Sequence, residues 1–228
     1  MIHQLVQADT FKNYYKVGDT KSVTLSTGEV VYMQVASINN GEGDAGAWYP
    51  RGTVDFISAD CLQTTYQMNT TQTNEGGWSS SGLRKTLNNT IVNTLPTELQ
   101  NIITEKTHKT SAGSGGAELV EHSDKLWIPT ECEVFGTSTN YSATTENANY
   151  NNQYGIFTDA GSRTKYLGTG GSPTRWWLCS PVGRGNNSEN HGSFCWVTRN
   201  GKTDNFVAEG GGGAHRTDTG VTICFRVG

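Results

Sequence analysis

The chain has 228 residues, a formal net charge of -4, a pI near 5.7 and a mean hydropathy of -0.54. This acidic balance excludes the basic surface that nucleic acids attract, and no stretch approaches the ~18 consecutive apolar residues of a membrane helix. We therefore expect no nucleic-acid partner and no membrane insertion, and the 28 glycines predict long loops around a small sheet.

The N-terminal third has the pattern of β-structure. Residues 22–25 and 29–38 are rich in β-branched side chains and flank a short turn that contains Gly28, which predicts a hairpin. Residues 39–52 contain several glycines and a proline, so we expect a loop there. The short apolar run at residues 54–57 predicts a buried strand.

The pattern becomes helical between residues 79 and 104, where leucines and isoleucines recur at a spacing of three or four. Pro96 would cost about 3 kcal/mol inside a helix. We therefore predict one helix over residues 80–93, capped by the hydroxyl of Ser79 or Ser80. A second helix is expected to have Pro96 as its first residue.

The middle of the chain is predicted to be mostly loop. Residues 110–116 are small and flexible, and residues 137–171 are dominated by Asn, Thr, Tyr and Gly, which is typical of a long functional loop. Residues 126–129 predict a short strand that a proline ends. We interpret the Glu-Cys-Glu sequence at residues 131–133 as a loop with a buried cysteine rather than as a metal or thiol site.

The C-terminal region alternates apolar and polar segments. Residues 175–181 and 220–227 are bulky and apolar, which predicts two strands, and residues 194–197 and 206–208 are short apolar islands between them. The Asn-Gly pair within residues 199–202 suits a type I′ hairpin turn. The intervening stretches are polar and rich in glycine.

Cysteine usage limits the chemistry that the chain can perform. The cysteines are odd in number and form no Cys-x-x-Cys pair, which argues against a disulfide framework and a zinc ribbon. The histidines lack the spacing of metal ligands. We therefore expect no cofactor and no metal, and reduced, mostly buried thiols. The cysteines are Cys61, Cys132, Cys179, Cys195 and Cys224.

Two motifs carry a resemblance to a known family. Residues 78–88 read Trp-Ser-Ser-Ser-Gly-Leu-Arg-Lys-Thr-Leu-Asn. They resemble the W-x-x-S-x-L-R-x-x-L-N signature of a domain family of unknown function that is common in gut bacteria and their phages. Residues 176–181, Trp-Trp-Leu-Cys-Ser-Pro, resemble that family's W-W-L-R-S-P, with Cys179 in place of arginine.

The resemblance extends almost to the end of the chain. Residues 220–225 stand where the family has G-V-R-P-x-F, although Thr222 and Ile223 replace its Arg-Pro pair. The similar part covers residues 22–227. We therefore expect an N-terminal segment of residues 1–21, followed by one domain over residues 22–228.

That family is similar to a branch of the C-type-lectin-like fold, which the formylglycine-generating enzymes and the variable proteins of diversity-generating retroelements share. The resemblance implies an α+β fold with two helices, small antiparallel sheets and long ordered loops. In the variable proteins, adenine-directed mutagenesis rewrites selected codons of a C-terminal segment. By this resemblance, a variable region is expected at about residues 176–228.

The resemblance divides this region into a frame and a recognition surface. Burial of large apolar side chains, worth ~1.5–3 kcal/mol each, would stabilise the frame and leave the surface free to vary. The frame residues are Trp176, Trp177, Leu178, Pro181, Phe194, Val197, Gly201, Val221, Ile223 and Phe225. The expected ligand contacts are Arg184, Asn186, Asn187, Ser188, Glu189, Asn190, Trp196, Thr198, Arg199, Lys202, Asp204, Asn205, Glu209, His215, Arg216 and Asp218.

A tryptophan in this region could belong either to the frame or to the recognition surface. Trp176 and Trp177 are adjacent, so we expect one to face inward and the other outward or into a second layer, with a structural role for both. For Trp196, a core position is an open alternative to ligand contact. Exposed Trp and Arg among Ser, Gly and Asn would match the composition of antibody binding sites.

We therefore expect a ligand- or receptor-binding protein that is not an enzyme, at a phage or prophage tail tip or on a bacterial surface. The expected partner is a bacterial surface protein or glycan, and tail-tip proteins suggest a homotrimer. Residues 1–4 lack the features of a signal peptide, which predicts synthesis in the cytoplasm. Two alternatives stay open: an oxidase resembling the formylglycine-generating enzymes, with Cys195 and Cys224 as its thiols, and a structural tail subunit.

Overall fold

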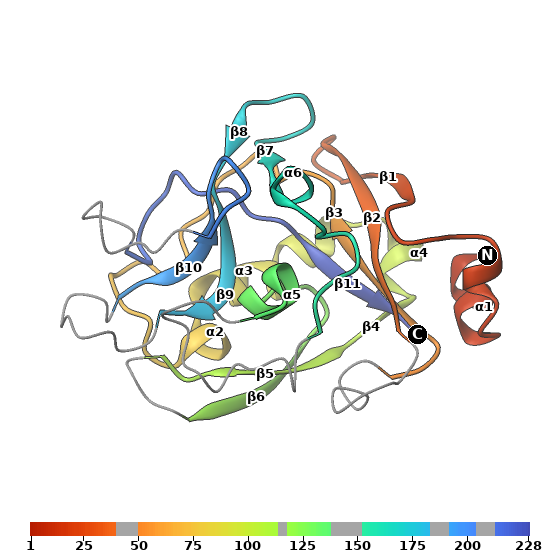
Figure 1. Ribbon diagram of the computed structural model, residues 1–228, viewed down its shortest axis with the longest axis horizontal. Helices are drawn as coiled ribbons and strands as arrows, with labels where there is room; N and C mark the ends of the chain where they lie inside the picture. The colour runs from red at the N-terminus through yellow and green to blue at the C-terminus, as the bar shows by residue number, and fades with distance from the viewer. Residues whose placement is uncertain (40–49, 114–117, 138–151, 183–191, 204–212) are drawn as a thin grey trace.

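The computed structural model describes residues 1–39, 50–113, 118–137, 152–182, 192–203 and 213–228. It is an α+β fold with small antiparallel sheets and few, short helices, as the sequence indicates (Figure 1). The two termini lie at the same end of the molecule (Figure 1). Within the described residues, no helix is long and apolar enough to cross a membrane.

The largest sheet has five antiparallel strands and curls into a half-barrel. The order across the sheet is β1 (Thr20–Thr24), β2 (Val30–Asn39), β3 (Thr53–Ser58), β11 (Cys224–Val227) and β4 (Ile103–Thr104). The predicted hairpin is confirmed by β1 and β2, with Gly28 at φ 88° in the turn between them. The predicted strand at residues 54–57 is confirmed by β3. The C-terminal strand β11 therefore lies inside this sheet, between β3 and β4.

The predicted helix over residues 80–93 is broken into three short pieces, α2 (Gly77–Ser80), α3 (Gly82–Asn89) and η2 (Ile91–Thr94). Ser81 makes the first break because its backbone is extended, and its hydroxyl accepts a hydrogen bond from the Arg84 N–H. The predicted cap at Ser79 or Ser80 was therefore wrong by one or two residues. Pro96 lies just before α4 (Thr97–Gln100) as its N-cap.

The middle of the chain differs from the predictions in three places. β5 (Lys106–Ser111) and β6 (Leu119–Asp124) form a hairpin that was not predicted. Of the loop predicted at residues 110–116, residues 110–111 belong to β5, residues 112–113 lie outside the strands, and residues 114–116 lie outside the described residues. The expected strand at residues 126–129 has only one bridge, between Trp127 and Cys224. The Glu-Cys-Glu sequence forms α5 (Glu131–Phe135), which a capping box at Thr130 begins.

The described part of the predicted long loop at residues 137–171 contains short elements. These are α6 (Ala160–Arg163) and β7 (Lys165–Tyr166), which pairs with β8 (Pro173–Thr174). Residues 138–151 of that prediction lie outside the described residues. At the start of the chain, α1 (Ile2–Gln7) and η1 (Phe11–Asn13) pack on the sheet through Val6 and Phe11.

The predicted frame is buried. β9 (Trp176–Pro181) and β10 (Phe194–Val197) form an antiparallel pair, and each of their residues has its side chain in the core. The second frame strand is shorter than predicted, because only residues 224–227 of the expected 220–227 are strand. Residues 206–208, the second predicted apolar island, lie outside the described residues.

Candidate functional site

Four charged side chains lie in the centre of the molecule, and each is at most 4% exposed: Asp55, Lys106, Glu133 and Arg226, called here the central charge cluster. Arg226 donates two hydrogen bonds to Asp55, from Nε to Oδ1 at 2.6 Å and from Nη2 to Oδ2 at 2.9 Å. Lys106 Nζ binds the Glu133 carboxylate and lies 3.5 Å from Asp55 Oδ2. Two acids thus match two bases across β3, β5, α5 and β11.

The two cations of the cluster offset the effect of burial on Asp55. Burial alone would raise the pKa of Asp55, but the Arg226 guanidinium and the Lys106 ammonium outweigh it and hold the pKa below its ordinary value. Lys106 also donates to the hydroxyl of Tyr154 at 3.1 Å. Since all four charged side chains are enclosed, we assign the cluster to the stability of the fold rather than to binding.

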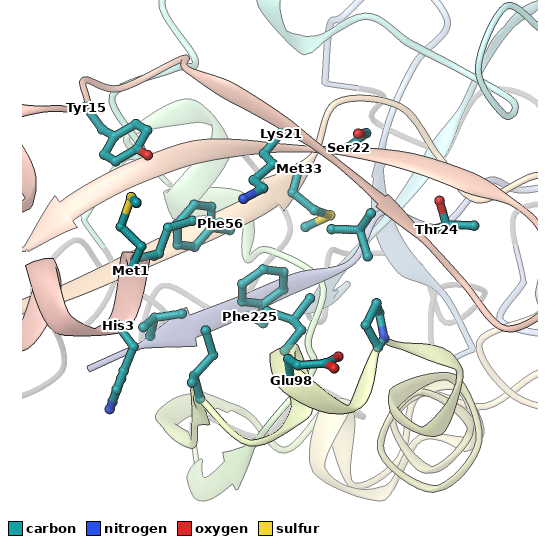
Figure 2. Close-up of a pocket in the computed structure, with 16 residues that line it drawn as sticks. Met1, His3, Tyr15, Lys21, Ser22, Thr24, Met33, Phe56, Glu98 and Phe225 are labelled. Atoms are coloured by element: carbon teal, nitrogen blue, oxygen red, sulfur yellow. The ribbon is translucent and has the colours of Figure 1, made fainter.

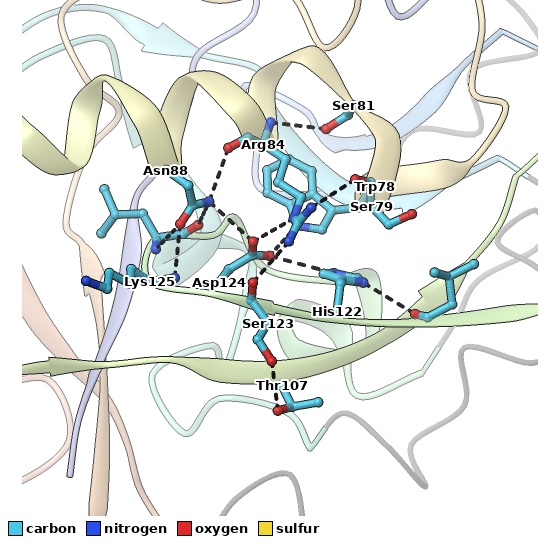
Figure 3. Close-up of polar contacts among 12 residues, drawn as sticks. Trp78, Ser79, Ser81, Arg84, Asn88, Thr107, His122, Ser123, Asp124 and Lys125 are labelled. Atoms are coloured by element: carbon cyan, nitrogen blue, oxygen red, sulfur yellow. Dashed lines mark hydrogen bonds and ion pairs between the residues drawn. The ribbon is translucent and has the colours of Figure 1, made fainter.

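A second network is centred on Asp124 and explains the 78–88 motif (Figure 3). Trp78 Nε1 donates to Asp124 Oδ2 at 2.9 Å, and Arg84 Nε donates to Oδ1 at 2.6 Å. Asn88 accepts the backbone N–H groups of Lys125 and Leu126. The polar residues of the motif therefore hold the end of β6 against α3, while its two leucines point into the core. The Asp124 network (Trp78, Arg84, Asn88 and Asp124) is structural.

Two stacked histidines lie between these networks. The rings of His108 and His122 are 5.4 Å apart and nearly parallel, and His108 also contacts the edge of Trp127. Burial lowers the pKa of His122 to about 4 and that of His108 well below its usual value. Both imidazoles are therefore neutral at pH 7. Among the described residues, no group of three His, Cys, Asp or Glu side chains could hold a metal ion.

The two frame tryptophans point in different directions, and both are completely buried. Trp176 Nε1 donates to the Arg163 carbonyl at 3.0 Å, while Trp177 Nε1 donates to the Tyr66 carbonyl at 2.9 Å. The structural role predicted for both is confirmed. Neither tryptophan faces outward, so the alternative holds, in which the second tryptophan packs into a second buried layer.

Trp196 was predicted to contact ligand, and that prediction was wrong. Its side chain is 3% exposed and lies 5.6 Å from the ring of Trp177. The guanidinium carbons of Arg175 and Arg216 lie 5.1 and 5.9 Å from its ring centre. Trp196 fills the space beneath these cations because β10 places it on the same face of the strand pair as Trp177. The open alternative, a core position, is the one that the structure shows.

Above Trp196 lies a small charged cluster at the surface, the arginine–aspartate cluster of Arg175, Arg216 and Asp218. Arg216 binds Asp218 through Nε at 2.8 Å and Nη2 at 2.7 Å, and Arg175 lies 3.5 Å from the same carboxylate. The hydrogen bonds from Arg216 hold the pKa of Asp218 below its ordinary value. Asp218 keeps 53% of its side chain exposed, so the cluster faces solvent.

The turn after β10 carries two exposed cations, at positions 199 and 202, and packs against α6. The Gly201 N–H donates to the Thr198 carbonyl, and Gly201 has φ 69°. A type I′ turn also needs a positive φ at Asn200, which is absent, so that prediction was wrong; the turn has three residues with Gly201 left-handed. A side chain at position 201 would lie 1.8 Å from the Ala160 carbonyl oxygen, so the turn is held tightly against α6.

The expected contacts fall into three groups. Trp196 is buried, and those on the described surface are exposed or half-buried: Thr198, Arg199, Lys202, His215, Arg216 and Asp218. The others lie outside the described residues: Arg184, Asn186, Asn187, Ser188, Glu189, Asn190, Asp204, Asn205 and Glu209. Arg175 was not among the expected contacts, although strand alternation places its side chain on the same face as Trp177.

The five cysteines are buried, as predicted, and none of them forms a disulfide in this structure. Burial raises the pKa of Cys61 to about 12 and that of Cys224 well above its ordinary value. A protonated thiol is a poor nucleophile. The geometry at Cys224 therefore gives no support to thiol chemistry.

The described structure is thus an α+β protein with buried tryptophans, balanced interior charges and an exposed cationic turn beside a surface ion pair. A family model described as Domain of unknown function (DUF6273) matches residues 52–225, which include both motifs. The chain belongs to this family. No curated protein and no solved structure matches the chain.

Proposed function

We propose that this chain is a ligand-binding protein of the C-type-lectin-like kind, and that its C-terminal surface recognises a bacterial surface protein or glycan. The observation that carries the proposal is the separation of buried from exposed residues within residues 175–218. The frame side chains are enclosed, whereas Arg199, Lys202 and His215 point away from the core. Such a surface can change its side chains without changing the fold.

The chemistry of the described surface supports recognition of a polar ligand. Arg199 and Lys202 lie on the tight turn, and Arg175 and Arg216 flank Asp218. Arginine offers a rigid fork of donors that matches carboxylates and phosphates. The site in this proposal also includes the polar stretch at residues 183–191 and the expected contacts Asp204, Asn205 and Glu209, which the resemblance assigns to the recognition surface. A tail-tip or cell-surface location and a homotrimer belong to the same proposal.

Binding of fluorescently labelled protein to whole cells of a panel of gut bacteria tests the proposal by flow cytometry. We expect the native chain to bind a subset of species. The triple variant Arg199→Ala, Lys202→Ala and His215→Ala should bind at least about tenfold more weakly, and its thermal stability should be unchanged. The control is a second triple variant, Lys85→Ala, Lys109→Ala and Lys125→Ala, whose substitutions lie outside the C-terminal surface. Pretreatment of the cells with protease or with periodate then separates a protein receptor from a glycan.

Two results would contradict the proposal. One is equal cell binding by the triple variant and the control. The other is a triple variant that leaves cell binding intact but prevents assembly into phage particles, which would instead assign the surface to packing in a tail.

A further inference from the structure

An apolar pocket lies on the five-stranded sheet, away from the C-terminal recognition surface. α1 and η1 cover one end of this sheet face, and α4 covers the other. Between them is a pocket of about 680 Å³ (Figure 2). Pockets for small ligands usually measure about 300–1,000 Å³.

The floor of this pocket is apolar and long. It is formed by Val23 of β1, Met33 of β2, Phe56 of β3, and Phe225 and Val227 of β11. These four strands are neighbours in the sheet. At a strand spacing of ~4.8 Å, the floor spans about 14 Å. This shape suits an extended aliphatic chain.

The opposite wall comes from the helices. Leu99 and Ile102 follow Pro96 around α4, and Ile2 and Tyr15 come from the N-terminal segment. These side chains are only partly buried, although they pack against the core. A ligand that filled the pocket would complete their burial, at a gain of ~25 cal/mol for each Å² of apolar surface.

Polar groups at the pocket lack partners in the described structure. Lys21 lies opposite Met33 in the β1–β2 register and lines the pocket, as Figure 2 shows. Lys21 forms no ion pair with any described residue. The Nδ1 atom of His3, another lining residue, is buried without a described hydrogen-bond partner. Glu98, the one acidic lining residue, lies on the α4 side.

We propose that this pocket binds an amphiphile with an unbranched alkyl chain and a carboxylate head, with the chain along the sheet floor and the carboxylate at Lys21. The charge at the β1 rim decides the head group, because an ammonium attracts a carboxylate and repels a cationic head. A lysine on an edge strand can also serve to prevent pairing with strands of other molecules. That role does not require an apolar pocket next to the lysine. This site is independent of the proposed C-terminal recognition surface.

Displacement of a fluorescent fatty acid by unlabelled dodecanoic acid measures binding directly. We expect saturable binding of one molecule per chain below the micelle concentration. Each shortening of the acid by two methylenes should weaken binding about tenfold, since a buried methylene contributes roughly a factor of three to four. Dodecanol and dodecyltrimethylammonium should bind several times more weakly than dodecanoate.

Three variants locate the site. Lys21→Glu should weaken dodecanoate binding about tenfold and leave dodecanol unchanged, whereas Lys85→Glu on α3 is the matched control with no effect. Leu99→Trp fills the pocket and should abolish binding of both. Because Lys21 is exposed, Lys21→Glu should not disturb the fold. It therefore tests the site even if Leu99→Trp fails to fold.

Several outcomes would overturn the proposal. They are the absence of saturable binding, equal affinity for the three head groups, or dodecanoate binding that Lys21→Glu leaves unchanged. Dimerisation in sedimentation experiments that Leu99→Trp abolishes, without fatty-acid binding, would assign the pocket to a second copy of the chain instead.

Discussion

The carboxylates of Asp55 and Asp124 are both buried, yet their pKa values move in opposite directions. Burial is the largest influence on each and raises the pKa. At Asp55 two cations, Arg226 and Lys106, overcome it. At Asp124 the indole of Trp78 and the single cation Arg84 do not, and the pKa stays raised. The number of cations beside each of these two acids therefore accounts for the direction in which its pKa moves.

Removing the charge from the central cluster should have the largest effect. In Asp55→Asn, Arg226 and Lys106 lose their counter-charge inside the core, and we expect the free energy of unfolding to fall by about 3–5 kcal/mol. Urea denaturation measures the change, with the exposed Glu118→Gln as control. A loss below about 1 kcal/mol would show that the cluster contributes little.

The histidine pair that lies between the two networks should make stability depend on pH. Because the pKa values of His108 and His122 are lowered in the fold, the unfolded chain binds their protons first as the pH falls below about 6.5. Stability should therefore decrease from pH 6.5 downwards, by up to about 1.4 kcal/mol per pH unit for each imidazole, until the folded pKa is reached.

Thermal unfolding of the native chain and of His122→Gln between pH 7 and pH 5 tests this dependence. The variant should show a shallower slope, because one of the two depressed imidazoles is gone. Identical slopes in the two proteins would mean that His122 is not protonated on unfolding in this range.

The Asp124 network should be less sensitive than the central cluster. Arg84→Leu removes three side-chain hydrogen bonds, to Asp124, Ser79 and Ser123. We expect a loss of about 1–3 kcal/mol, smaller than for Asp55→Asn because Asp124 can take up a proton when its cation is gone. The comparison in urea at pH 7 and at pH 5 would show the loss shrinking at the lower pH. A loss that grew on acidification would contradict this reasoning.

The exposed turn should have the smallest effect on stability. Arg199→Ala and Lys202→Ala should each shift the melting temperature by less than about 2 °C, because neither side chain is buried. Differential scanning fluorimetry measures this. Gly201→Ala is the contrasting variant in the same turn, because the added Cβ would collide with the Ala160 carbonyl. It should lower the melting temperature by more than about 4 °C.

Local sequence pattern predicted the elements whose side chains repeat regularly. The alternating β-branched residues of the β1–β2 hairpin and the bulky residues of β9 were sufficient. The β5–β6 hairpin was missed because its buried side chains include Lys106, His108 and Thr110, which are polar. The burial of Lys106 depends on partners distant in the sequence, Glu133 and Tyr154, and no local pattern shows these.

The candidate surface was predicted in outline but not in detail. The sequence separated the frame from the exposed turn, and Thr198 to Lys202 lie where it placed them. It could not decide Trp196, because one residue of strand register determines whether an indole faces water or Trp177. The apolar pocket was also beyond sequence reasoning, since its lining comes from six separate helices and strands.

The five buried thiols give the folded chain a set of internal reporters. A thiol reacts with an alkylating reagent only when the structure around it opens, so the rate at each cysteine measures the local free energy of opening. Cys61 lies beside β3 and β7, Cys132 in α5, Cys179 in β9, Cys195 in β10 and Cys224 in β11. Native-state alkylation followed by mass spectrometry would thus show, without any added label, which strand of the frame opens first.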